Sequence, residues 1–381
     1  MRVLFISASK FDSLSAEASR INFLSQLFSF DNEVRILCRG SKNVNSLEKI
    51  EIFNLSNQLL IQSNKLARLV DYVLFHQKVK KYLINNKDTI DAIVFCALST
   101  TTLRFILKYS KKYNKILIHD AVEWYSAEQF KYGALNRLYI KKELWMRHLL
   151  PGNCRIIAIS RYLQDYFSLL GNKCVYIPSI LEVNEMKVKE IKSSDKITIV
   201  YAGIPHKKDY LGIALEGIAM LDNNYLSRIE IKIMGITKNQ AKENYISFET
   251  INKLGDSLIF LGLVPRNIVF SELKKADFSI LLRPDYQRYS KAGFPTKVPE
   301  SMSVGTAVIC NFTSDLKDFL IDGKNCIEVR DCSAIEMHRS MQRILELSRT
   351  EINNISKEAI ITSLKSFDFR NYKKEVSEIL E

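Results

Sequence analysis

Short apolar runs alternate with longer stretches of helical periodicity along almost the whole chain. An apolar run at residues 2–8 is followed by an amphipathic stretch over 16–30 and a second run at 33–39. This strand–helix–strand unit is the building block of a parallel sheet. The alternation continues with strands expected at 91–97, 115–119, 155–159 and 174–178, and helices at 60–87 and 100–113. The runs are almost continuously apolar, which indicates strands covered on both faces.

The second half of the chain repeats this pattern after a polar stretch at 181–196, which we interpret as a linker. Strands are expected at 197–202, 229–234, 259–263, 277–282, 306–310 and 326–329, and helices at 210–221, 240–254, 267–275, 297–304, 333–348, 351–362 and 369–380. The pattern predicts an α/β protein with two doubly wound domains, residues 1–185 and 186–365. Residues 366–381 are expected to form a helix that packs back towards the N-terminal domain.

Two features of the helical and terminal segments add to this prediction. The long helix at 60–87 has Leu66, Val70, Val73 and Leu74 as its expected core stripe. The first nine residues are interpreted as a strand, because their apolar run is too short for a signal peptide and lacks a small-residue cleavage pattern. No run of 18 apolar residues occurs, so any membrane contact is expected to be peripheral.

The charge, the cysteines and histidines, and the absence of certain motifs limit the classes of function that we expect. The net charge of +13 suits nucleic acid, anionic lipid or phosphorylated substrates, or simply a basic soluble surface. The basic residues are scattered and no zinc-finger or RNA-binding pattern appears, so nucleic acid is not expected as a partner. The seven cysteines form no CxxC pair and the five histidines are dispersed, so neither a disulfide framework nor a metal site is predicted. P-loop, GxSxG and GxGxxG motifs are absent, and the last absence argues against a dinucleotide cofactor.

The stretch from Arg283 to Asn311 holds the densest group of candidate residues. A loop after the strand at 277–282 leads into a helix near Thr296, and helix N-termini attract phosphate. Arg283 and Lys297 flank this helix start and suit the two charges of a diphosphate. Glu300, one turn later, is suited to accept hydrogen bonds from ribose hydroxyls. The alternative is a capped helix with a solvated charged face.

A second candidate region follows the strands at 197–202 and 229–234. Gly203 allows close backbone approach, and Lys208 precedes the next helix. Gly235 ends the following strand in the same way. An ordinary strand–helix turn would also explain the first of these glycines.

The N-terminal half offers polar residues at the end of the strand at 115–119. His119, Asp120 and Glu123 lie where ligands bind in parallel sheets, although Asp120 could instead be a helix N-cap. Ser160 is expected to cap the helix that follows the strand at 155–159. Arg20 is a candidate for binding an anionic acceptor, with a solvated helix charge as the alternative.

The segment PTKVPESMSVGTAVI, residues 295–309, resembles the donor-binding segment of the group 1 (family 4) retaining glycosyltransferases. The glycine of YAGIPHKKD at 201–209 and the Met234–Gly235 strand end also resemble that family. The pattern departs at Ala292, where the family has an acid eight positions before the one matching Glu300. The AGFPTK variant at 292–297 is similar to a subgroup found in bacterial surface-polysaccharide clusters.

The resemblance implies a GT-B fold, in which two Rossmann-like domains face a central cleft, and a metal-independent retaining hexosyltransferase. It implies donor binding by Gly203, Lys208, Gly235, Arg283 and the residues Phe294, Pro295, Thr296, Lys297 and Glu300. Catalytic roles fall on Asp120, His119 and Lys208, and acceptor binding on Arg20 and Glu123. No cofactor is expected beyond a UDP- or GDP-sugar co-substrate.

The expected acceptor is a glycan or a lipid-diphosphate-linked glycan in capsule, O-antigen or exopolysaccharide synthesis. The protein is expected in the cytoplasm, with peripheral contact to the anionic inner face of the membrane. Two alternatives stay open: a sugar-nucleotide epimerase on the same fold, and a catalytically degenerate nucleotide-sugar-binding protein, motivated by Ala292.

Overall fold

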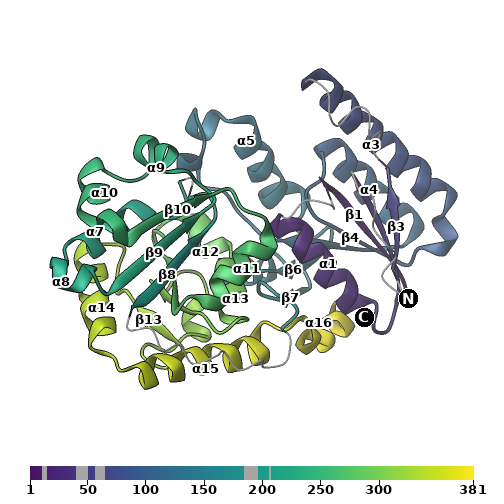
Figure 1. The fold of residues 1–381 in the computed structure, drawn as a ribbon. Coiled ribbons are helices and arrows are strands. Elements are labelled where there is room, and N and C mark those ends of the chain that lie inside the picture. Colours follow the sequence, from purple (N-terminus) through teal and green to yellow (C-terminus); the bar gives the residue numbers. More distant parts are fainter. Residues whose placement is uncertain (11–14, 40–49, 56–64, 184–195, 206) are drawn as a thin grey trace. The chain divides into compact units, whose positions relative to one another are not determined.

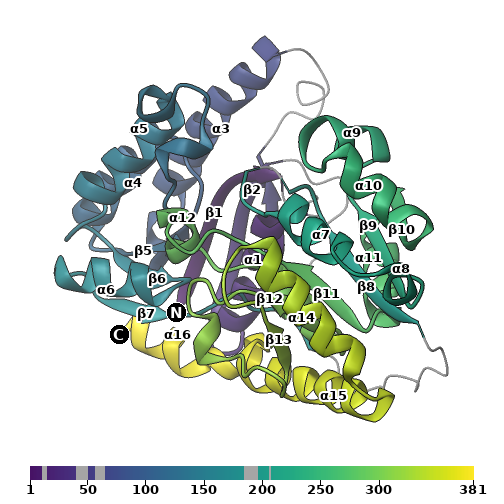
Figure 2. The ribbon, with the colours of Figure 1, turned by 90° about the vertical axis from the view of Figure 1, so that its left-hand side faces the viewer.

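The computed structural model describes residues 1–10, 15–39, 50–55, 65–183, 196–205 and 207–381. The chain forms two compact units, which we call unit 1 (Met1–Glu182 with Phe369–Glu381) and unit 2 (Val183–Asp368). Each unit is a parallel sheet with helices on its faces (Figures 1 and 2). Most of the stretch expected to be a linker, residues 184–195, lies outside the described residues.

Unit 1 contains a seven-stranded sheet in the order β3-β2-β1-β4-β5-β6-β7, with every neighbouring pair parallel. Its strands are β1 (Arg2–Lys10), β2 (Glu33–Arg39), β3 (Ile50–Asn54), β4 (Ala92–Phe95), β5 (Ile116–Ala121), β6 (Arg155–Ala158) and β7 (Cys174–Tyr176). The helices are α1 (Ala16–Phe28), α3 (Lys65–Asn85), α4 (Thr100–Tyr113), α5 (Arg137–Leu144), α6 (Arg161–Leu169) and α16 (Lys373–Leu380). The Ser160 hydroxyl accepts the backbone N–H of Leu163, which confirms Ser160 as the cap of α6.

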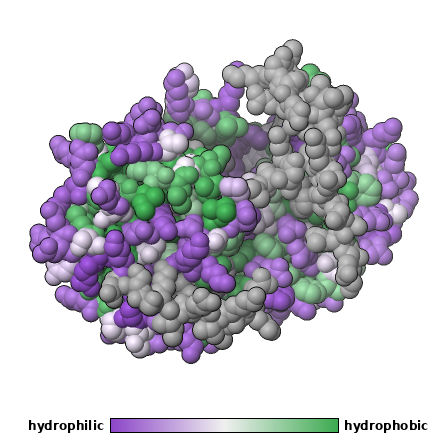
Figure 3. Space-filling view, in the orientation of Figure 1, coloured by the Kyte–Doolittle hydropathy of each residue, from purple (hydrophilic) through white to green (hydrophobic). Residues whose placement is uncertain are grey.

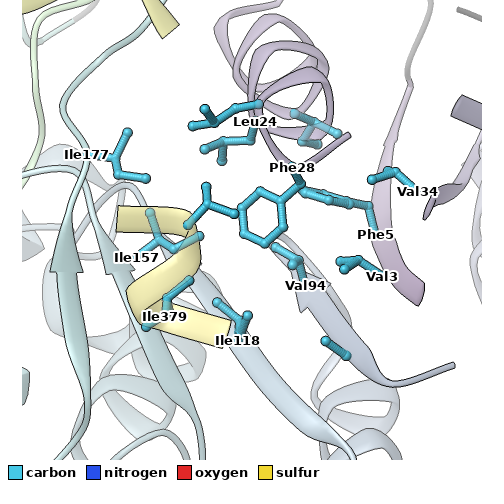
Figure 4. Packing of buried hydrophobic residues seen from close by; sticks show 14 of the residues in the cluster. Val3, Phe5, Leu24, Phe28, Val34, Val94, Ile118, Ile157, Ile177 and Ile379 are labelled. Atoms are coloured by element: carbon cyan, nitrogen blue, oxygen red, sulfur yellow. The ribbon is translucent and has the colours of Figure 1, made fainter. Parts of the chain in front are cut away.

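The core of unit 1 joins the first helix to the last (Figure 4). Leu24 and Phe28 of α1 pack with strand residues such as Val94 and with Ile379 of α16. The rings of Phe5 and Phe28 meet edge to face with centroids 5.4 Å apart. Residues more than 350 positions apart in the sequence therefore share one hydrophobic core, and the chain's last helix folds with unit 1.

Unit 2 contains a six-stranded sheet in the order β10-β9-β8-β11-β12-β13, again with parallel pairs. Its strands are β8 (Ile197–Ala202), β9 (Ile229–Met234), β10 (Leu258–Gly262), β11 (Phe278–Leu281), β12 (Ala307–Cys310) and β13 (Cys326–Glu328). The helices are α7 (Leu211–Ala219), α8 (Asn223–Leu226), α9 (Lys238–Asn244), α10 (Phe248–Leu254), α11 (Arg266–Lys275), α12 (Arg288–Ala292), α13 (Lys297–Met302), α14 (Ala334–Glu346) and α15 (Arg349–Ser366). The two doubly wound sheets confirm the predicted fold class.

The predicted core stripe of α3 is wrong at Val70 and Val73, whereas Leu74 is half-buried and the side chain of Leu66 lies outside the described residues. Val70 and Val73 are exposed, whereas Phe75 and Val79 are buried. Asp71 lies on the buried face as well, because Arg39 at the end of β2 forms an ion pair with it at 2.7 Å. A charged residue that the apolar pattern left outside the core stripe is thus buried.

Two further elements differ from the prediction. The strand β3 was not expected, because its sequence, IEIFN, is short and lies at the edge of the sheet. The helix expected over 240–254 is divided into α9 and α10, since the Ser247 hydroxyl accepts the backbone N–H of Thr250 and starts a new helix.

Candidate functional site

The chain order of the unit 2 sheet reverses between β8 and β11, which lie side by side. Open parallel sheets bind ligands at such a switch point, beyond the carboxyl ends of the strands. The loops that follow these two strands begin at Gly203 and Leu282, and they hold most of the residues predicted to bind a donor. The topology therefore brings the two sequence stretches to one end of one sheet.

Lys297, the first residue of α13, lies directly over Gly203. A Cβ atom added to Gly203 would be 2.8 Å from Lys297 Cε and 2.9 Å from Nζ. Gly203 also has φ of +132°, a conformation that side chains disfavour. Gly203 and Lys297, from the two stretches of candidate residues, are thus in direct contact, and a side chain at position 203 would displace the lysine.

A buried carboxylate joins the two cations of this site. Asp209 Oδ1 accepts a hydrogen bond from Arg283 Nε at 2.8 Å, and Oδ2 accepts one from the Lys297 ammonium. Tyr201 of β8 bridges the same atoms, since its hydroxyl accepts from Lys297 Nζ at 2.8 Å and donates to Asp209 Oδ2 at 2.9 Å. The ammonium also lies 4.1 Å from the Tyr201 ring centroid, a cation–π contact.

The charges in this cluster are unequal. Burial disfavours ionisation of Asp209, but Arg283 and Lys297 outweigh it and lower the pKa of the carboxyl to about 2. Burial lowers the pKa of Lys297, and Asp209 opposes that effect. Two cations share one anion, which leaves an excess of one positive charge. The lysine and arginine side chains keep 22% and 16% of their surface exposed, against 4% for Asp209.

Arg283 is fixed through its backbone as well. Its N–H donates to Asn311 Oδ1 at 2.9 Å, and its carbonyl accepts from Asn311 Nδ2 at 2.7 Å. Asn311 follows β12, the next strand in the sheet. Within the described residues, the Arg283 side chain is hydrogen bonded through Nε, which leaves its two terminal amino groups open to another anion.

Gly235 has a packing role at the end of β9. A Cβ there would lie 2.5 Å from the Gly203 carbonyl oxygen, and its φ is +105°. Its N–H donates to the Gly262 carbonyl at 2.7 Å. The ends of three neighbouring strands are therefore drawn together. Figure 3 shows hydrophobic residues gathered over β10 and α11 beside this edge, where Leu263 is highly exposed.

The residues around α13 differ in their surroundings. Glu300 Oε1 accepts a hydrogen bond from Arg266 of α11 at 3.2 Å, and burial raises the pKa of Glu300 while Arg266 and Lys297 oppose that shift. Phe294 is buried against Phe319 and Phe367, so its ring anchors the loop, and Pro295 is buried beside it.

Thr296 precedes α13 and makes no side-chain capping bond to it. The helix has only six residues, which is too short for a strong dipole. Lys297 and Arg283, rather than the helix N-terminus, therefore carry the charge of this site. Lys208 lies one residue before Asp209 and is partly exposed, and its backbone N–H donates to the Pro205 carbonyl.

Unit 1 contains a different arrangement at the end of β5. Arg20 of α1 donates to both carboxylate oxygens of Asp120, with an ion-pair distance of 2.8 Å, and to the carbonyls of Ile177 and Pro178. Both side chains are buried. The alternative of a solvated charge at Arg20 is therefore wrong. Asp120 lies within β5 and caps no helix, so that alternative is wrong too.

His119, which precedes Asp120 in β5, is buried and stacks on Phe95 with centroids 4.8 Å apart. Its Nδ1 lies 3.3 Å from the Phe95 carbonyl, and Nε2 has no hydrogen-bond partner among the described residues. Burial lowers the pKa of His119 to about 3, so the imidazole is neutral near pH 7 and Nε2 acts as an acceptor. Glu123, partly exposed, hydrogen bonds Tyr125 and raises the pKa of its phenol, as burial does to a larger extent.

Sequence reasoning missed three residues that the structure brings into these clusters. Asp209 and Tyr201 join the two cations of unit 2, and Arg266 pairs with Glu300. Asp209 follows two lysines directly, and an acid next to the start of an apolar helix was the available signal.

Within the described parts of the chain, no helix combines the length and apolar character needed to cross a bilayer. Across the same residues, no group of three or more His, Cys, Asp or Glu side chains is arranged to hold a metal ion.

Residues 182–361, nearly all of unit 2, match the family model described as "Glycosyl transferases group 1". No curated protein sequence matches the chain. This match covers slightly less than half of the chain, so it shows that unit 2 is similar to the group 1 glycosyltransferases and supports the coarse prediction of glycosyltransferase activity.

Solved structures extend the likeness to both units. Anabaena HepE, crystallised with UDP and glucose, is 15% identical with a TM-score of 0.65, covering 100% of this chain and 99% of that one. Sucrose-phosphate synthase from Thermosynechococcus elongatus is 13% identical with a TM-score of 0.72, covering 99% and 97%. WaaG, a glycosyltransferase of lipopolysaccharide biosynthesis, is 13% identical with a TM-score of 0.66, covering 99% of each chain. At these identities the likeness shows the fold, which is GT-B.

Proposed function

We propose that the chain transfers a hexose or N-acetylhexosamine from a UDP- or GDP-sugar to a hydroxyl of a glycan or lipid-linked glycan. The observation that carries the proposal is the pair of cations, Lys297 and Arg283, at the switch point of unit 2. The similar protein HepE, crystallised with UDP and with UDP-glucose, favours UDP as the nucleotide. We assign the reaction to surface-polysaccharide synthesis, with retention of anomeric configuration.

The chemistry follows from the leaving group. When the sugar departs, negative charge builds on the diphosphate oxygen, and preorganised cations stabilise it. Lys297 has three N–H donors, of which Asp209 and Tyr201 occupy two. The third, together with the terminal amino groups of Arg283 and the ammonium of Lys208, would neutralise the leaving diphosphate. In the proposal these side chains supply the charge that a metal ion provides in other enzymes.

The remaining predicted residues take roles that fit their surroundings. Glu300 accepts hydrogen bonds from the ribose through the carboxylate oxygen that Arg266 does not hold. In unit 1, the partly exposed Glu123 contributes to acceptor binding, whereas His119, whose Nε2 is buried, lies behind the surface that a substrate reaches. Arg20 and Asp120 hold each other and shape this end of the sheet rather than bind substrate.

Thermal unfolding with a panel of UDP, GDP and their sugars tests the proposal. A ligand bound only by the native protein raises the melting temperature, and at about 100 times its Kd the stabilisation is about 2.7 kcal/mol. We expect a shift with UDP or GDP that is lost in Lys297→Ala and weakened in Glu300→Ala. Lys324→Ala, an exposed lysine of unit 2 that pairs with Glu358, is the matched control and should keep the shift. No shift with any nucleotide would overturn the assignment.

Turnover separates transfer from the two alternatives. Incubation of the protein with the donor alone should give no epimerised sugar, whereas added glycan acceptors should give a longer glycan with the retained anomer. Epimerisation without acceptor would identify an epimerase. Donor binding without any turnover over a broad acceptor panel would identify a binding protein.

A basic apolar segment in unit 1, residues 129–142, supports contact with the inner face of the cytoplasmic membrane. Leu135 is 82% exposed and Tyr132 is 73% exposed, and Leu138 of α5 is exposed close by. The segment contains four Lys or Arg residues and no acid, with Lys131 and Arg137 at the surface. Apolar side chains flanked by cations suit an anionic bilayer. A second copy of the same segment would repel it.

Co-sedimentation with vesicles tests this contact. The protein should bind vesicles that contain phosphatidylglycerol and bind weakly to pure phosphatidylcholine, and Leu135→Glu/Leu138→Glu should lose most of the binding. Leu169→Glu changes an equally exposed leucine of unit 1 outside the segment and should bind as the native protein does. Equal binding by both variants would show that this segment is not the contact.

A further inference from the structure

Asp209 differs from its neighbours in the donor site because it carries the wrong charge for binding phosphate. It is buried, lies between Lys208 and the start of α7, and contacts both predicted phosphate-binding cations. A carboxylate next to a diphosphate would be repelled if it faced the ligand. The arrangement therefore requires a different role for Asp209.

We propose that Asp209 is a positioning residue, which holds Lys297 and Arg283 at fixed places so that both point their remaining donors at one diphosphate. The inference rests on the proposed function, because it takes these two cations as the donor-binding pair. Each carboxylate oxygen takes one cation, so the two side chains are spaced by the width of a single carboxylate. Glu272 also joins two lysines through its two oxygens, but one of them, Lys275, is 64% exposed. Both cations of Asp209 are mostly buried and lie at the switch point of the sheet.

The geometry distinguishes this role from that of a counter-ion that occupies every donor of the two cations and so prevents them from binding a phosphate. Arg283 contacts Asp209 through Nε, the atom nearest the chain, and so keeps its terminal amino groups. Lys297 keeps one of its three donors, because Tyr201 and Asp209 take the others. Neither cation has to leave Asp209 before it can bind an anion.

Asp209 also maintains the charge of Lys297. The charged groups facing the ammonium are Asp209, Arg283 and Glu300, and burial acts against its ionisation. Asp209 raises the pKa of Lys297, and Arg283 lowers it. Without the carboxylate, two cations would remain close together in a poorly solvated place, and the lysine would lose its proton at a lower pH.

The experiment measures UDP and GDP affinity by titration calorimetry between pH 7 and pH 10. Asp209→Asn keeps the size of the side chain and removes the charge. In metal sites, loss of a residue that orients a ligand costs about 10- to 100-fold in affinity, and we expect a loss of that order here. The pH above which affinity declines should also move to lower pH in this variant. Ionisation of the nucleotide is common to both proteins and cancels in the comparison.

Three further variants separate positioning from general damage to the fold. Asp209→Glu keeps the charge and should recover part of the affinity and the native pH profile. Tyr201→Phe removes the bridging hydroxyl alone and should cost less than Asp209→Asn. Asp322→Asn neutralises a carboxylate of unit 2 that pairs with Arg343, and it should change neither affinity nor pH profile.

The outcomes are distinct. If Asp209→Asn binds the nucleotide as tightly as the native protein, or more tightly, at every pH, Asp209 is a competing counter-ion and the inference is overturned. A loss of affinity with an unchanged pH profile, and no recovery in Asp209→Glu, would reduce the residue to a structural role and overturn it as well. If the native protein binds neither UDP nor GDP, the proposed function fails together with the inference.

Discussion

The buried ion pair of unit 1 and the charged cluster of unit 2 use the same residue types for opposite purposes. In unit 1, one arginine meets one aspartate, and Arg20 also donates to two carbonyls. In unit 2, one aspartate meets two cations, both of which keep part of their surface exposed. The first cluster is neutral and internally satisfied, whereas the second has an excess positive charge and donors left over.

The comparison explains why residue type alone does not identify a binding site. Arg20 pairs with Asp120 near the end of β5, and Arg283 follows the end of β11, so both lie near the carboxyl end of a parallel sheet, where ligands bind. Only Arg283 retains donors for an anion. The number of partners that surround a charge, rather than its place in the fold, decides whether it is available to a ligand.

The largest expected effect comes from breaking the neutral pair. Arg20→Met leaves Asp120 buried without its partner, which costs about 3–5 kcal/mol of unfolding free energy. Both tryptophans, Trp124 and Trp145, belong to unit 1, so denaturant unfolding followed by tryptophan fluorescence reports on this unit.

Arg35→Met is the matched control for that experiment, since Arg35 pairs with the largely exposed Glu51. It should cost less than about 1 kcal/mol. UDP affinity of the folded Arg20→Met protein should be unchanged. A loss of affinity as large as that of Lys297→Ala would show that Arg20 belongs to the binding machinery after all.

The next largest effect is expected at His119, whose burial makes the unfolding free energy of unit 1 depend on pH. Its folded-state pKa of about 3 lies below the unfolded value of about 6.5. The neutral form is therefore favoured by folding, so this stability is present above pH 6.5 and is lost as the pH falls towards 3. Linkage predicts a loss of about 2 kcal/mol between pH 7 and pH 5.

His119→Gln should remove this pH dependence from the tryptophan-detected unfolding, because glutamine does not titrate. His148→Gln, at an exposed histidine of the same unit, should keep the native profile. Identical profiles for the native protein and His119→Gln would mean that His119 is solvated, which would weaken its assignment as a buried acceptor.

The fold was predictable because its signals are local and repeated. Strands β8 and β9 and helix α4 have the expected bounds, since each is a run of one periodicity with clear ends. The predicted stripe of α3 missed the buried face of the helix, on which Asp71 lies in a non-local ion pair with Arg39. Apolar periodicity does not register a charge that is buried by a partner 32 residues away.

The candidate site was predictable to a smaller extent. Family resemblance and glycine positions indicated Gly203 and Lys297, which the structure brings into contact. Asp209 was missed, because an acid beside two lysines is typical of a solvated loop. Its burial depends on Arg283, 74 residues further along the chain, and no local pattern contains that contact.

The smallest expected effect comes from a substitution at Gly203, which tests the charged cluster of unit 2 most directly. In Gly203→Ala the new methyl group would lie 2.8 Å from Lys297 Cε, so the lysine has to move away from its position beside Asp209. We expect UDP affinity to fall by roughly tenfold, in line with the loss of one charge-assisted hydrogen bond.

Gly323→Ala is the control, because Gly323 also has a positive φ of +72° but nothing within 4 Å of its added Cβ. Both variants should lose about 1–3 kcal/mol of unfolding free energy from backbone strain. Only Gly203→Ala should lose affinity, and equal affinities in the two would mean that the position of Lys297 over Gly203 does not matter for the nucleotide.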